Sequence, residues 1–173
     1  WTLVPTYVGR QADCATYGNP PRPFTYRIST NEATAATQGA DAAQDAIAQM
    51  KKLGIGSNNP IYLDVEGYNT GNSPCAVGVH SFTNAWTRTL HANGYLSGIY
   101  GSAASTIRHV QSWSQQSGYN APDNVWVAAW NGEPDNFSLK NSKTGKYDIP
   151  IFSDDSMWSG KRIHQFLGGH YET

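Results

Sequence analysis

Five short apolar runs divide the chain, and each is bounded by Gly, Pro or Asn. Runs of this length are typical of buried β-strands, and they cover residues 2–8, 61–65, 96–100, 125–130 and 163–167. Between them, apolar residues recur at helical spacing within residues 39–54, 79–94 and 103–116. This alternation of strand and helix predicts an α/β protein with a parallel sheet.

The second run, PIYLDVEGY at residues 60–68, distinguishes a barrel from an open sheet. Its odd positions are aliphatic and its even positions are polar or amphipathic, whereas a doubly wound sheet is apolar on both faces. Long loops follow the first, second and fourth strands, over residues 9–36, 67–74 and 131–161, and no GxGxxG or GxxxxGK[ST] phosphate loop is present. We therefore expect a TIM (β/α) barrel whose mouth lies at the carboxyl ends of the strands.

The length of 173 residues fits one domain but is short for such a barrel, which takes about 250 residues. Five strands leave open edges, so either the fold closes differently or further elements lie outside this sequence. The expectation is a single barrel domain over residues 1–173, truncated at both ends.

Asp64 and Glu66 end the second strand, and residues two apart on a strand point to the same face, about 7 Å apart. Two neighbouring acids raise each other's proton affinity, and one protonated and one ionised carboxyl are what glycoside hydrolysis requires. Two alternatives remain: a metal site, for which no further oxygen ligands are evident, and a structural role as a loop cap or as ion-pair partners of Arg10 or Arg162. No metal or cofactor is predicted.

Aromatic residues at or near strand ends favour a carbohydrate cleft, because flat rings stack on sugars and their polar atoms bind hydroxyls. The candidates that would line the mouth are Tyr7, Tyr62, Tyr68, Tyr100, Trp126 and Trp130. Asn131 and Gln165 are candidate polar contacts, although the last strand could turn His164 inward instead.

Composition points to neutral ligands. A net charge of -1 without basic clusters gives no electrostatic case for nucleic acid or an anionic membrane, and no apolar stretch reaches the roughly 20 residues of a membrane span. Cys14 and Cys75, each in a loop after a predicted strand, suggest a disulfide and a secreted protein; the alternative is two free thiols in the cytosol.

Six segments together resemble the glycoside-hydrolase-like domain family: LVPTYVGRQ (3–11), GADAAQDAIAQMKKLGIG (39–56), PIYLDVEGY (60–68), FTNAWTRTLHANGYLSGIYGS (82–102), PDNVWVAAWNG (122–132) and RIHQFLGGHYET (162–173). This family consists of TIM-barrel proteins of bacterial envelopes and is distantly similar to family 25 glycoside hydrolases, the lysozymes of peptidoglycan. The resemblance implies that strands three to seven are present and that strands one, two and eight lie outside this sequence.

By the same resemblance, Glu66 matches a general acid and Asp64 the carboxylate that assists it. The sequence thus predicts a secreted, envelope-associated glycoside hydrolase acting on cell-wall polysaccharide such as peptidoglycan. The main alternative is a non-catalytic domain that binds the same glycan. A third, an open α/β fold of unrelated function, predicts no cluster of Asp64, Glu66 and Tyr100.

Overall fold

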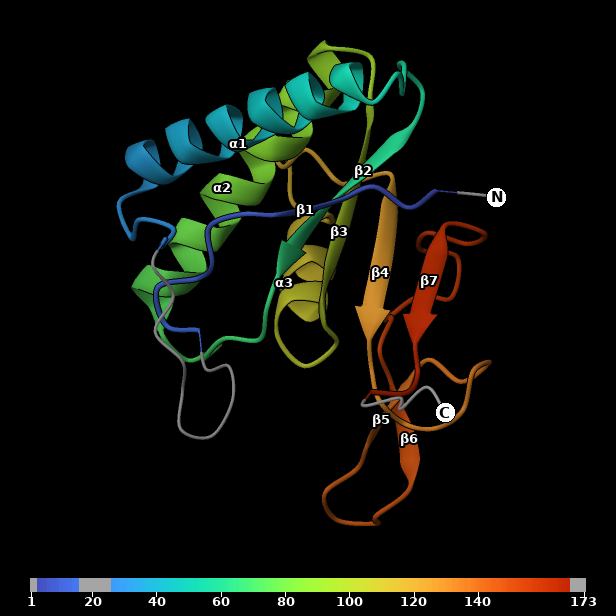
Figure 1. The fold of residues 1–173 in the computed structure, drawn as a ribbon. Helices are drawn as coiled ribbons and strands as arrows, with labels where there is room; N and C mark the ends of the chain where they lie inside the picture. The colour runs from blue at the N-terminus through green and yellow to red at the C-terminus, as the bar shows by residue number, and fades with distance from the viewer. Residues whose placement is uncertain (1–2, 16–25, 169–173) are drawn as a thin grey trace.

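The computed structural model describes residues 3–15 and 26–168, in which the five predicted strands form one parallel sheet (Figure 1). The strands lie in the order β1, β2, β3, β4, β7, with bounds Thr6–Val8, Pro60–Val65, Leu96–Ser102, Asn124–Ala128 and Arg162–Gln165. The predicted parallel α/β fold is therefore confirmed. The first strand is shorter than predicted, and residue 2, where the prediction began it, lies outside the described residues.

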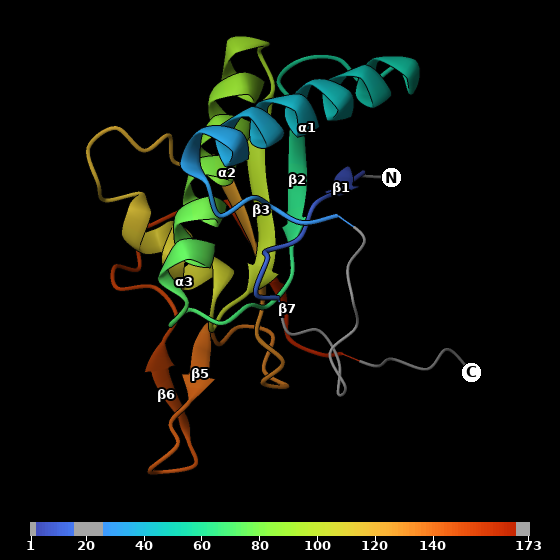
Figure 2. The ribbon, with the colours of Figure 1, turned by 90° about the vertical axis from the view of Figure 1, so that its left-hand side faces the viewer.

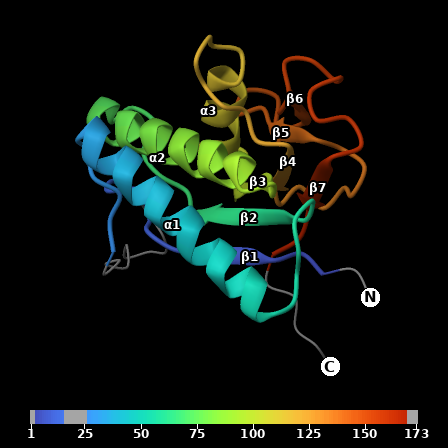
Figure 3. The ribbon, with the colours of Figure 1, turned by 90° about the horizontal axis from the view of Figure 1, so that it is seen from above.

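The helices of the described residues lie on one side of the strands, as Figure 3 shows from above. They are α1 (Glu32–Lys52), α2 (Ser73–Ala92) and α3 (Thr106–Trp113). The first two begin at asparagine caps, whose side chains accept hydrogen bonds from backbone N–H groups of the first turn. None of the helices in the described ranges is long and apolar enough to cross a membrane.

The core lies between this helical layer and the sheet. Ile61, Leu63 and Val65 of β2 point toward the helices and are buried, as are Val125 and Val127 of β4. Because side chains alternate along a strand, the same pleat turns the intervening residues of β2 to the opposite face.

Two glycines allow close backbone contacts of α1 and α2, one between the two helices and one between α2 and the segment before α1. A Cβ at Gly39 would collide with the carbonyl oxygen of Phe82, and one at Gly78 with the carbonyl oxygen of Ser29. Only a residue without a side chain fits at these two contacts, so they bring α2 close to α1 and to the segment before it.

The sheet does not close in the described residues. β1 pairs only with β2 and β7 only with β4, so the two edges of the sheet do not meet. Five strands span only part of the circumference that about eight strands complete. The expected TIM barrel is thus not confirmed, and the structure shows an open parallel sheet with one face covered by helices.

A β-hairpin, not a helix, connects β4 to β7. Its strands, β5 (Ser138–Lys140) and β6 (Tyr147–Pro150), pair antiparallel in a region predicted to be a loop. Figure 2 shows the hairpin projecting beyond the carboxyl ends of the sheet strands. Phe137 and Ile151, which flank it, anchor it to the core.

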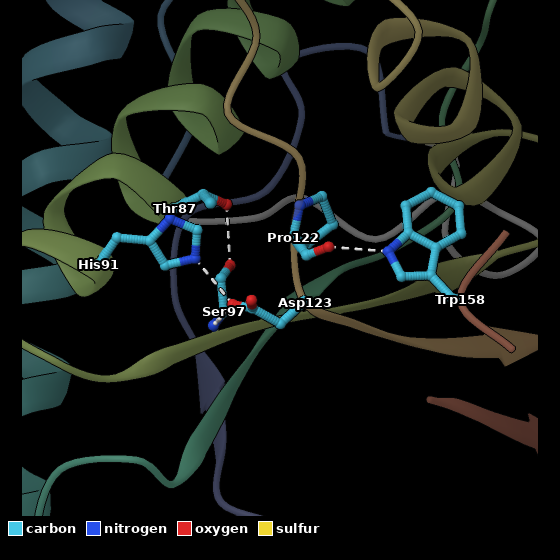
Figure 4. Close-up of polar contacts among 6 residues, drawn as sticks. All are labelled: Thr87, His91, Ser97, Pro122, Asp123 and Trp158. Carbon is cyan, nitrogen blue, oxygen red and sulfur yellow. Dashed lines mark hydrogen bonds and ion pairs between the residues drawn. The ribbon is translucent and has the colours of Figure 1, made fainter. Parts of the chain in front are cut away.

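The opposite end of the sheet carries an amino-edge cluster of polar residues, Thr87, His91, Ser97 and Asp123 (Figure 4). The Asp123 carboxylate accepts a 2.8 Å bond from the Ser97 N–H and lies 2.7 Å from His91 Nε2, while the Thr87 and Ser97 hydroxyls bond each other at 2.8 Å. Nearby, Trp158 Nε1 donates to the carbonyl of Pro122 at 2.7 Å. These contacts join α2 to the starts of β3 and β4.

Cys14 and Cys75 form a disulfide, as the sequence suggested. Cys14 follows β1 in a loop, whereas Cys75 lies in the first turn of α2 and not in a loop as expected. An antiparallel bridge between Ala15 and Tyr68 accompanies the bond. The segments after β1 and β2 are thereby joined at the carboxyl edge of the sheet.

Candidate active site

A pocket of about 320 Å³ lies on the face of the sheet opposite α1, α2 and α3. The strands that form it run side by side in register, so that Asp64, Tyr100 and Trp126 occupy one row across β2, β3 and β4. The lining residues are Thr6, Asp64, Glu66, Tyr100, Trp126 and Gln165. This cluster of Asp64, Glu66 and Tyr100 is the one that an unrelated open α/β fold would lack.

The two carboxyl groups are electrostatically coupled. Burial, and then the charge of Glu66, raise the pKa of Asp64 to about 7. Burial also raises the pKa of Glu66, against the lowering effect of a hydrogen bond from the backbone of Gly67. Asp64 Oδ1 is buried and has no hydrogen-bond partner. The pair therefore retains a proton up to near-neutral pH.

Two side chains hold the backbone beneath the acids. Gln11, only 3% exposed, donates from Nε2 to the carbonyl of Asp64 at 3.0 Å and accepts from the N–H of Glu66 at 2.8 Å. On the other side, the Thr106 hydroxyl donates to the carbonyl of Val65 at 2.9 Å. These bonds continue the hydrogen bonding of β2 past the end of β1 and fix the direction in which both carboxyls project.

Aromatic rings form one wall of the pocket. Tyr100 packs edge-on against Trp126 with ring centroids 5.0 Å apart, and its hydroxyl donates to Gln165 Oε1 at 2.8 Å. Tyr62 is buried and also meets Trp126 edge-on, at 6.1 Å, so it supports the wall from beneath. Trp126 Nε1 is buried without a hydrogen-bond partner.

Two of the candidate tyrosines lie away from this pocket. Tyr7 points to the helical side, where its ring packs against Trp86 and its hydroxyl donates to Asp45 at 2.9 Å. Tyr68 is buried beyond the end of β2 with its hydroxyl 2.7 Å from His109 Nδ1. The prediction that both tyrosines line the mouth is therefore wrong. The side chain of Tyr7 points to the helix-covered face of the sheet, because side chains alternate along β1. Tyr68 lies beyond the end of β2, where this alternation of side chains no longer applies.

The remaining candidates follow β4 or lie on β7. Asn131 is largely buried and structures its own loop, donating to the carbonyls of Asn136 and Ser138. Trp130 is exposed and does not line the pocket. On β7 the structure turns Gln165 into the pocket, while His164 faces away and contacts the carbonyls of Pro134 and Ala129.

The arginines proposed as alternative partners of the acids are engaged elsewhere. Arg10 donates to the carbonyl of Arg27, and Arg162 donates to the carbonyl of Met157 and lies over the ring of Phe152. Within the ranges that the structure describes, the salt bridge found is that of His91 with Asp123. Those same ranges contain no group of three His, Cys, Asp or Glu side chains placed to hold a metal.

Three residues of the site were not identified from the sequence. Gln11 and Thr106 act through the backbone of β2, from positions 53 and 41 residues away along the chain. Thr6 lines the pocket from the edge strand. Thr6 and Gln11 approach the acids because β1 pairs with β2, and no local sequence pattern predicts this pairing.

Comparison with known proteins adds a family. The whole chain, residues 1–173, matches the family described as "Rv2525c-like, glycoside hydrolase-like domain", in agreement with the resemblance found in the sequence. No curated protein matches the chain. A crystal structure of an uncharacterized B. stearothermophilus protein aligns over 95% of this chain and 62% of its own, with 17% identity and a TM-score of 0.46.

Proposed function

Because the chain belongs to the Rv2525c-like, glycoside hydrolase-like domain family, we propose that it hydrolyses a bacterial cell-wall polysaccharide such as peptidoglycan, with Asp64 and Glu66 as its catalytic pair. The observation that supports this most is the pocket itself. It brings two coupled carboxyls, one of them with a pKa of about 7, together with a tyrosine, a tryptophan and an amide. The disulfide is compatible with work outside the cell, where such bonds persist.

The chemistry needs one proton and one negative charge in the same pocket. The protonated carboxyl gives its proton to the glycosidic oxygen as the C–O bond breaks, and the ionised carboxyl stabilises the positive charge that develops on the sugar. Water then supplies the hydroxyl of the new reducing end and returns the proton. A coupled pair that shares a single proton near neutral pH meets both requirements.

Glu66 is our assignment for the proton donor, because it stands at the open carboxyl end of β2, and Asp64 for its partner. Asp64 is the rival donor, since its pKa of about 7 lets it hold the proton at neutral pH. A substrate whose leaving group needs no proton distinguishes them, because only the donor variant regains turnover on it.

The other pocket residues suit a sugar. Tyr100 and Trp126 offer aromatic surface for a pyranose ring. The carbonyl oxygen of Gln165 accepts from Tyr100, which leaves the Gln165 amide N–H groups to donate to hydroxyls. We assign substrate binding to these three residues and a supporting role to Tyr62.

The test is release of reducing sugars from purified peptidoglycan. We expect Glu66→Gln and Asp64→Asn each to lower the rate by about 100- to 10,000-fold, the range of general acid–base catalysis. Asp41→Asn, an exposed acid of α1, is the matched control and leaves the rate unchanged. Circular dichroism confirms that each variant is folded.

Hydrolysis that survives both substitutions would exclude the pair as catalytic. A folded wild-type protein that sediments with peptidoglycan but releases no sugar would favour the non-catalytic binding domain. In that case Glu66→Gln leaves turnover at zero and changes only the bound fraction.

A further inference from the structure

Trp130 is a large apolar side chain left in water. Its residue is 65% exposed, whereas Trp86 is fully buried and Trp113, Trp126 and Trp158 are at least partly buried. Exposed aromatic surface beside a pocket commonly marks a binding site. The position of this ring therefore calls for a functional explanation.

One face of the indole rests on the backbone. The segment after β4 continues alongside the segment after β7, with hydrogen bonds from Ala129 N–H to the Gln165 carbonyl and from Gly132 N–H to the Phe166 carbonyl. A Cβ at Gly168 would lie 2.7, 2.8 and 2.9 Å from Cε2, Cδ2 and Cζ2 of Trp130. Nearly equal distances to three ring atoms place Gly168 over the ring and not at its edge.

This support leaves the ring held but uncovered. Gly168 closes one side and can do so because it has no side chain, while the exposed fraction of Trp130 leaves surface free for a ligand. A ring supported on one face in this way loses less conformational freedom when a ligand stacks on it than an unsupported ring would.

Trp130 also follows a pocket-lining residue closely along the chain. It lies four residues beyond Trp126, which lines the pocket, and two residues beyond the end of β4 at Ala128. Gln165, which also lines the pocket, pairs with Ala128 of β4 in the sheet register. A chain of sugars bound at the carboxylates and leaving over β4 would pass this ring.

We propose that Trp130, supported by Gly168, is a stacking platform for a further pyranose unit of the glycan held at Asp64 and Glu66. The C–H face of a pyranose packs on an indole face, which carries partial negative charge. This inference rests on the proposed function and extends it from one sugar at the acids to a longer stretch of the polysaccharide.

The test is calorimetric titration of peptidoglycan glycan fragments of increasing length into the Glu66→Gln protein, which does not consume them. Trp130→Ala in that background weakens binding of long fragments about tenfold and leaves the shortest fragment unaffected, whereas Trp130→Phe retains most of the affinity. Gly168→Ala displaces the ring and reproduces the loss with the tryptophan intact. Leu167→Ala, the neighbouring exposed apolar residue, is the control and changes nothing.

Equal affinity of wild-type and Trp130→Ala proteins for every fragment overturns the platform, and it does so whether or not the wild type hydrolyses peptidoglycan. Length-dependent binding that requires Trp130 supports the platform, even where hydrolysis is absent and the catalytic proposal fails. A wild-type protein that binds no fragment overturns the platform together with the proposed function.

Discussion

Two aspartates at opposite ends of the sheet have contrasting surroundings. In the amino-edge cluster, Asp123 accepts from the Ser97 backbone and contacts His91, and the hydroxyls of Thr87 and Ser97 bond each other (Figure 4). In the pocket, Asp64 has a buried oxygen without a partner, and its pKa rises to about 7. An aspartate carboxylate thus has hydrogen-bond partners at the amino end of the sheet, whereas one at the carboxyl end has an oxygen without a partner.

The contrast distinguishes polar groups that stabilise the fold from polar groups that are available for a reaction. Satisfied polar groups contribute to stability and have little left to offer a ligand. An unsatisfied, desolvated carboxyl lowers stability and persists in a fold when its reactivity is useful. We therefore expect changes in the amino-edge cluster to affect stability alone, and changes in the pocket to affect stability and activity together.

The largest effect on stability is expected for Gln11→Met. The substitution keeps the side-chain length but removes the hydrogen bonds of Gln11 to the Asp64 carbonyl and the Glu66 N–H. We expect it to lower the free energy of unfolding by about 2 to 4 kcal/mol. Urea unfolding measures this loss. Because Gln11 positions the acids, the pH profile of hydrolysis shifts as well.

The control is Gln38→Met, which removes one side-chain bond to the backbone of Ser29. It lowers stability and leaves the pH profile unchanged. If the pH profile of hydrolysis is also unchanged in Gln11→Met, Gln11 contributes to stability alone and does not position the acids.

Asp123→Ala comes next and probes the satisfied aspartate. It removes the acceptor of the Ser97 N–H and the partner of His91, and we expect a loss of about 1 to 3 kcal/mol in unfolding free energy. Peptidoglycan hydrolysis below the melting transition stays at the wild-type rate. A rate that falls in step with Asp64→Asn would end the distinction between the two regions.

Asp64→Asn is expected to stabilise the protein at high pH, in contrast to the two substitutions above. The folded pKa of Asp64, about 7, exceeds the ordinary 3.8, so the folded state binds more protons than the unfolded state between these values and loses stability as the pH rises. Above pH 7 the variant is therefore more stable than wild type, by about 1 to 2 kcal/mol after allowance for partial exposure. Urea unfolding at pH 8 shows this gain and at pH 4 shows none; an equal difference at both would contradict the pKa assignment.

The smallest effect is expected for Trp158→Phe. The change removes the hydrogen bond to the Pro122 carbonyl and keeps most of the ring that packs beside Phe152. We expect it to lower the free energy of unfolding by about 0.5 to 1.5 kcal/mol. Thermal unfolding detects it as a shift of a few degrees. Hydrolysis remains unchanged, and a variant that lost it would extend the site to the amino edge.

Sequence patterns predicted most of the fold where alternation was strong. The aliphatic residues Ile61, Leu63 and Val65 fixed the pleat of β2, and that pleat assigned Asp64 and Glu66 to one face before any pairing was known. In β1, Tyr7 and Val8 are both compatible with either face, so the pattern could not decide; the structure leaves Val8 exposed and turns Tyr7 to the helices.

Long-range features were beyond sequence patterns for a different reason. The hydrogen bonds of Gln11 and Thr106 depend on which strands become neighbours, which is a property of the whole sheet. The strands of the β5–β6 hairpin are short, and the glycine of its turn, Gly145, which adopts φ +71°, is a weak local signal. Closure of the sheet likewise depends on how many strands assemble.

The disulfide also defines how the chain responds to tension. Cys14 and Cys75 enclose α1 and β2 within a covalent ring of the chain, with the two carboxylates inside it. A pulling force applied outside the ring passes through the sulfur atoms and bypasses that loop, which hides about 200 Å of extended chain. Under such a force Asp64 and Glu66 stay on an unextended segment until the disulfide is reduced.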